Sequence, residues 1–178
     1  MSLYQELQNA KTEEDVKDAY IKALGLKGYS KNLIDIQTKE VWFEAKLSGK
    51  ESIYEMYTQL LHYVQVALNK GEYIPPFLAV IDPKKAAIMR SADVIPFLAK
   101  KTINWGTSAS RFTQEALESV STFLEVQAHY ASNKPSQEAI DEVSTYIGTH
   151  FVSFKIATHQ KEFIETVKTA IKSGEIIR

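Results

Sequence analysis

Residues 35–46, with the sequence DIQTKEVWFEAK, contain the pattern that decides the predicted fold. The apolar run over 41–43 is typical of a buried strand, and a second segment with strand character ends just before it. Only Lys39 and Glu40 lie near the point where the two segments meet, which favours a tight turn. The sequence therefore predicts a β-hairpin with strands over 32–38 and 41–47.

This hairpin gathers charged side chains. Successive side chains on a strand alternate between its faces, so Glu44 and Lys46 share a face at a spacing of about 6–7 Å. If Thr38 pairs with Val41 across the turn, Asp35 lies directly opposite Glu44. Two carboxylates so close repel each other unless a cation lies between them. The pattern favours a Mg²⁺ site, because this hard cation binds one or two carboxylates together with phosphate and water oxygens. The alternative is a surface hairpin whose acids and lysine form ordinary exposed ion pairs.

Two predicted helices flank the hairpin. The first begins after the N-cap candidate Thr12 and ends at Gly25, and its first turn contains Glu14 as an extra acid, with Glu13 as the alternative. The second lies between the hairpin and Gly71, with apolar residues at helical spacing. It carries polar side chains on one stripe, at steps of four residues: Glu55, Gln59 and Tyr63.

The remaining chain is predicted to contain strands over 77–82 and 85–91 and then helices over 113–131, 136–150 and 158–173. The element order predicts an α/β fold with a mixed central sheet flanked by helices, plus a C-terminal helical extension. A shift in composition places the predicted boundary near residue 111, between a core over 1–111 and an extension over 112–178.

Composition narrows the functional classes. The chain of 178 residues has 44% hydrophobic and 24% charged residues, no cysteine and a net charge of −1. A disulfide framework and a thiolate metal site are thereby excluded, and the four histidines show no metal-ligand spacing. With no apolar run long enough to span a membrane, we expect a cytoplasmic location. Residues 84–111 contain six basic residues and one acidic residue, so this segment either contacts phosphates or is simply solvated.

Taken together, these residues resemble the PD-(D/E)xK restriction-endonuclease-like nucleases. That family has an acid on the first helix, an Asp on one strand, E-x-K on the next and often Q-x-x-x-Y on the following helix. The corresponding residues here are Glu14, Asp35, Glu44-Ala45-Lys46, and Gln59 with Tyr63. The segments VWFEAK, SIYEMYTQLLHYV and INWGTSASRF look more narrowly like the N-terminal nuclease region of single-chain type II restriction–methylation enzymes. The resemblance covers residues 12–110, and Ile34 stands where the family motif has proline.

The resemblance implies Mg²⁺-dependent hydrolysis of double-stranded DNA, with Mn²⁺ as a possible substitute. Asp35, Glu44 and Glu14 would bind the metal, Lys46 would position or activate water, and Gln59 would support the site. It also implies methyltransferase and target-recognition domains in a longer chain, and a dimer on DNA.

Two other functional classes stay open at this stage. One is a DNA-binding relative that has lost hydrolysis, since folds outlive their functions. The other is an interaction module that uses its helical extension to hold partner domains.

Overall fold

The computed structural model describes residues 1–132 and 152–177, so the helix predicted over 136–150 lies outside the described residues. Its centre is a five-stranded sheet in the order β1-β2-β3-β4-β5. Strands β2 and β3 run parallel, and every other neighbouring pair runs antiparallel. The predicted α/β class with a mixed sheet is therefore confirmed. The strand bounds are β1 (Ile36–Gln37), β2 (Val41–Ala45), β3 (Phe77–Ile81), β4 (Lys85–Arg90) and β5 (Val152–Lys155).

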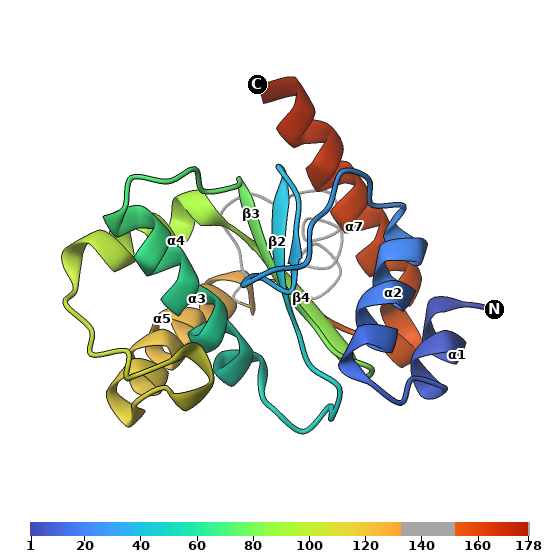
Figure 1. Cartoon of the computed structure of the whole chain (residues 1–178), viewed down its shortest axis with the longest axis horizontal. Coiled ribbons are helices and arrows are strands. Elements are labelled where there is room, and N and C mark those ends of the chain that lie inside the picture. The colour runs from blue at the N-terminus through green and yellow to red at the C-terminus, as the bar shows by residue number, and fades with distance from the viewer. Residues whose placement is uncertain (133–151, 178) are drawn as a thin grey trace.

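Helices cover both faces of the sheet (Figure 1). One layer contains α1 (Leu3–Gln8), α2 (Glu13–Leu24) and α7 (Ile156–Ile177), and the other contains α3 (Ile53–Asn69), α4 (Ser91–Lys100) and α5 (Gln114–Ser132). A short 3-10 turn, η1 (Ala109–Arg111), precedes α5. Successive side chains of β2 point to opposite faces of the sheet and so contribute to both hydrophobic cores. Phe43 packs towards α2, whereas Trp42 packs towards α3. No helix in the described ranges is long and apolar enough to cross a membrane.

The two helices that flank the hairpin begin and end where their sequences dictate. Thr12 caps α2 by accepting a hydrogen bond from the backbone N–H of Asp15, whose side chain bonds back to the cap. Gly25 ends α2 in the left-handed conformation, at φ 63°. Ser52 and Glu55 form the same reciprocal cap on α3. These caps fix the N-termini of both helices, and the predictions for α2 and α3 are confirmed.

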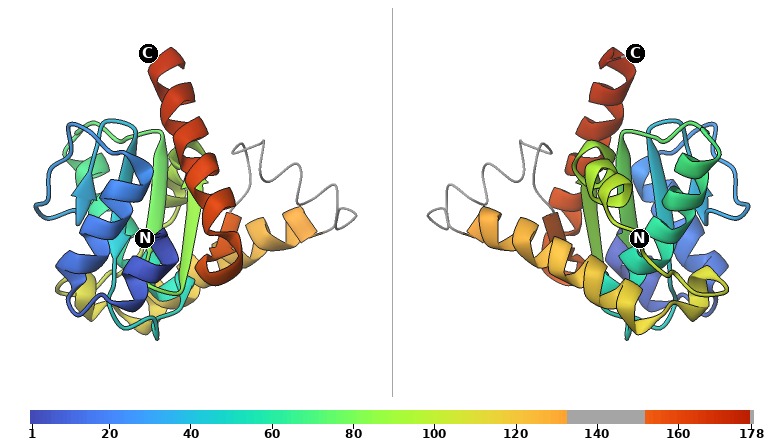
Figure 2. Two further views of the ribbon diagram at one scale, coloured as in Figure 1. Left: turned by 90° about the vertical axis from the view of Figure 1, so that its right-hand side faces the viewer. Right: turned by 90° about the vertical axis from the view of Figure 1, so that its left-hand side faces the viewer.

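The C-terminal segment differs from the expected all-helical extension. Residues 152–155 form β5, which pairs antiparallel with β4 and completes one edge of the sheet. Val152 and Phe154 are buried while Ser153 and Lys155 are exposed, which is the alternation of a half-buried strand. Helix α7 follows directly, and a non-helical backbone at His159 interrupts it inside the range predicted as one helix over 158–173. In two views at right angles to the first, α7 lies beside the sheet and α5 reaches away from it (Figure 2).

Candidate functional site

The β1–β2 hairpin has the register that the sequence predicts. Ile36 pairs with Phe43 and Gln37 with Trp42, so the next position places Asp35 opposite Glu44. The backbone N–H of Thr38 donates to the carbonyl of Val41 at 3.0 Å and closes the turn. The two acids thus meet at the end of the hairpin away from its turn, beside the point where β2 leaves the sheet.

Asp35 is held by contacts to both of its carboxylate oxygens. Oδ2 accepts a hydrogen bond from the backbone N–H of Ala45 at 2.8 Å. Oδ1 lies 3.6 Å from the ammonium of Lys17, which projects from α2. The carboxylate is therefore oriented by the neighbouring strand β2 and by helix α2.

Glu44 is the most deeply buried acid of this group, with 5% of the residue exposed. Desolvation and then the neighbouring Asp35 charge raise its pKa to about 8. Lys46 lies 3.6 Å from Glu44 Oε1 and only partly offsets this rise. Without a stronger cation nearby, the Glu44 carboxyl keeps a proton at neutral pH.

Lys46 faces acids from several segments. Burial alone would lower the pKa of its ammonium, but Glu44, Glu51, Glu13 and Asp35 together outweigh burial and raise it. The ammonium therefore stays charged at neutral pH. The predicted grouping of Asp35, Glu44 and Lys46 is present in the structure.

The acid contributed by α2 is Glu13 and not Glu14. Burial and then the charge of Asp35 raise the pKa of the Glu13 carboxyl, and Lys46 and Lys17 oppose that rise. The Glu14 carboxylate instead pairs with Lys31 at 2.8 Å and is half exposed. Of the two acids that the sequence offered at the start of α2, Glu13 therefore lies near Asp35 and Lys46, whereas Glu14 pairs with Lys31.

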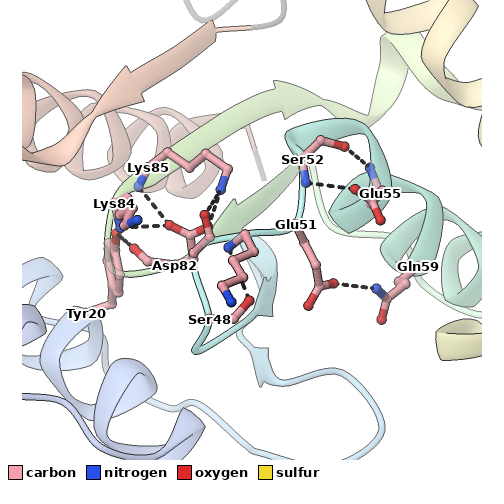
Figure 3. A network of polar contacts seen from close by, with 11 residues as sticks. Tyr20, Ser48, Glu51, Ser52, Glu55, Gln59, Asp82, Lys84 and Lys85 are labelled. Atoms are coloured by element: carbon pink, nitrogen blue, oxygen red, sulfur yellow. Dashed lines mark hydrogen bonds and ion pairs between the residues drawn. The ribbon is translucent and has the colours of Figure 1, made fainter.

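Gln59 is linked to the site by a hydrogen bond to Glu51, an acid that the sequence did not predict as a site residue. Its Nε2 donates to Glu51 Oε2 at 3.1 Å, and the two side chains point towards each other from α3 and from the segment before it (Figure 3). Glu51 in turn interacts electrostatically with Lys46 and Glu13. Tyr63, one turn after Gln59, has its pKa raised by burial and then by the charges of Glu44 and Asp35.

The segment between β2 and α3 is anchored by a second carboxylate–lysine pair. Asp82, which is fully buried, accepts hydrogen bonds from the backbone N–H groups of Lys84 and Lys85 at 2.8 Å each. The Lys85 ammonium contacts Asp82 (Figure 3). It also donates to the carbonyl of Gly49 at 3.1 Å. The Tyr20 hydroxyl donates to the Asp82 carbonyl at 2.7 Å. These bonds connect the segment before α3 to the β3–β4 turn and to α2.

The basic segment over 84–111 does not form one surface at the site. Because β3 and β4 are antiparallel, Ala86 pairs with Ile81 while Arg90 pairs with Phe77. Lys84 and Lys85 therefore lie at the end of the sheet where Ala45 leaves β2, and Arg90 lies at the opposite end.

The donor set fits a hard divalent cation, although the side chains form no complete cage. Among the described residues, no group of three or more His, Cys, Asp or Glu side chains is arranged to hold a metal ion. Mg²⁺ is usually bound by only one or two carboxylates and keeps several water ligands. Asp35 and Glu44 meet that requirement. Glu13, Asp35, Glu44 and Glu51 with Lys17 and Lys46 carry a formal charge of −2 when all six are ionised.

Comparisons of the chain with models of protein families, with curated proteins and with solved structures found no match.

Proposed function

We propose that this chain is a divalent-metal-dependent DNA endonuclease domain with a restriction-endonuclease-like core. The observation that supports this most strongly is the contact between the buried Glu44 carboxyl and Asp35, with Lys46 3.6 Å from Glu44. Two acids forced together in a buried position cost stability, and a site that binds a cation during its work has a physical reason to keep them.

Mg²⁺, or Mn²⁺ in its place, would supply positive charge to polarise a phosphodiester and to acidify water. Asp35 and Glu44 would hold the ion, and Glu13 would replace Glu14 as the acid that α2 contributes. Lys46 would orient the attacking water or stabilise negative charge that develops on the phosphate. Gln59 would act through Glu51, since its amide donates to that carboxylate. Glu44 would release its proton as the ion binds, which makes metal affinity rise with pH.

The proposed substrate is double-stranded DNA. Lys84 and Lys85 lie at the end of the sheet that carries the acids, where they are placed to meet phosphates, although Lys85 also anchors the segment before α3. In the reading suggested by sequence resemblance, methyltransferase and target-recognition domains belong to the same longer chain, and two copies act on the two DNA strands.

A plasmid-nicking assay tests this proposal. Supercoiled DNA is incubated with the longest natural chain in Mg²⁺ or Mn²⁺, and Lys46→Ala is compared with the parent. We expect the variant to lose about 10²-fold or more of the activity, the scale of a positioned charged group in a transition state.

Lys39→Ala is the matched control, because Lys39 is an exposed lysine at the turn of the same hairpin. Equal cleavage by the parent and Lys46→Ala would exclude the proposed site. DNA binding without cleavage by the parent in either metal would favour an inactive DNA-binding relative.

A further inference from the structure

The site contains two ammonium groups, and each lies against a different carboxylate. Lys46 contacts Glu44 and comes from the E-x-K motif. Lys17 contacts Asp35 at the same N–O distance of 3.6 Å and comes from helix α2. The resemblance assigns no role to Lys17, yet its side chain is only 15% exposed and its ammonium contacts Asp35.

Lys17 contacts the Asp35 oxygen that receives no backbone hydrogen bond from the described residues. Asp35 Oδ2 already accepts the Ala45 N–H, so Oδ1 is the oxygen without a backbone donor. Lys17 lies against that oxygen. A cation that binds Asp35 through Oδ1 therefore meets an ammonium at its own position, and the two positive charges repel each other.

The backbone beneath Lys17 is fixed, whereas its side chain can move. Val16 and Tyr20, which flank it on α2, are fully buried, and the Tyr20 hydroxyl is bonded to the Asp82 carbonyl. Lysine has a flexible four-carbon stem and a strongly hydrated ammonium, so its head can leave Asp35 without any change in the helix.

We propose that Lys17 is a positioning residue that neutralises Asp35 while the metal is absent and is displaced from it when a divalent cation binds. This inference rests on the proposed function. Lys17 thereby competes with the metal for one carboxylate oxygen and offsets the charge of Asp35 in the empty site. A lysine that merely orients Asp35 for the metal would act in the opposite direction, since loss of such an orienting partner usually weakens metal affinity about 10–100-fold.

Calorimetric titration of the full chain with MnCl₂ separates the two roles. We expect Lys17→Met to bind Mn²⁺ about tenfold more tightly than the parent, because a competing charge has been removed. Lys17→Arg keeps the charge and should bind as the parent does. Lys22→Met is the matched control on the same helix, since Lys22 pairs with Glu6 and is largely exposed, and it should leave affinity unchanged.

Circular dichroism and thermal melting in EDTA establish that each variant is folded, and Lys17→Gln replaces Lys17→Met if the latter is not. Unchanged or weaker Mn²⁺ binding by the neutral variant overturns the role of Lys17. If the parent binds Mn²⁺ and Asp35→Asn does not, that result leaves the metal site itself standing. If neither binds Mn²⁺, or both bind equally, the proposed metal site fails and the inference fails with it.

Discussion

Two carboxylate–lysine groups lie close together at one end of this sheet, and their environments differ sharply. Asp82 is fully buried, yet it receives two backbone N–H groups and the Lys85 ammonium. Glu44 is almost as buried, but its neighbours are Asp35 and a lysine at 3.6 Å. The first group is electrostatically complete and stabilises a turn. The second contains more acids than lysines, because Glu13, Asp35, Glu44 and Glu51 lie near only Lys17 and Lys46, which is the condition expected of a site that binds a cation.

The largest effect should come from breaking the complete group. Asp82→Ala removes the acceptor for two backbone N–H groups and leaves Lys85 without its counter-charge. We expect a loss of about 3–5 kcal/mol in the free energy of unfolding, the usual result of removing one partner from a buried pair. Urea unfolding at pH 7 measures it. Asp18→Ala, which removes a mostly exposed acid, serves as control, and a cost no larger than that of the control would mean that Asp82 does not hold the turn.

The incomplete group should respond in the opposite direction. In the folded chain the Glu44 carboxyl keeps its proton up to about pH 8, whereas its ordinary pKa is 4.5. Unfolding between these values releases a proton, so stability falls as pH rises through this window, by up to about 1.4 kcal/mol per pH unit from this group. Glu44→Gln removes the titration, so it should match the parent below about pH 4.5 and become more stable than the parent as pH rises towards 8.

Urea unfolding in EDTA across pH 4.5–8.5 measures this difference. Parallel stability profiles for the parent and Glu44→Gln would show that Glu44 is not the group that carries the cost.

Adding the missing charge sharpens the comparison. Mn²⁺ or Mg²⁺ at about 100 times its Kd should stabilise the parent by about 2.7 kcal/mol, or roughly 5–10 °C in Tm for a chain of this size. Asp35→Asn should show almost no shift, because an amide replaces an anionic ligand. Thermal melting with and without metal gives the result, and equal shifts in both proteins would place the bound ion elsewhere.

The smallest effect concerns the segment that joins the two groups. Gly49 has φ 69°, and a Cβ there would lie 3.1 Å from the Lys84 side chain. Gly49→Ala should cost about 1–2 kcal/mol from the left-handed backbone, plus a smaller amount from displacing Lys84. Gly28→Ala is matched in φ but has open space around the new Cβ, so the difference in urea unfolding between the two variants isolates the contact. A smaller cost at Gly49 than at Gly28 would contradict this account.

The sequence predicted the parts of this molecule that depend on local pattern. The cap at Thr12 and the alternation along β2 follow from short-range rules, and the two-strand register follows once the turn at Thr38 is placed. Asp35 opposite Glu44 is a consequence of that register. No tertiary information is needed for it.

The features that the sequence did not predict depend on packing between distant segments or on patterns that are too short to recognise. Glu51 lies in an irregular segment, where no periodicity indicates which way a side chain points. The choice between Glu13 and Glu14 is a rotation of one residue about the helix axis, which only the docking of α2 settles. Strand β5 is four residues long and is followed at once by a helix, so its alternation was too short to outweigh the helical pattern beside it.

The late position of β5 in the chain limits how far the protein can be truncated from its C-terminus. A polypeptide that stopped at residue 111 would retain both acids and Lys46, but its β4 strand would present a bare row of amide and carbonyl groups. Such open edges recruit other chains. Soluble behaviour of any shortened version should therefore depend on keeping 152–155, even though three strands separate β5 from β1.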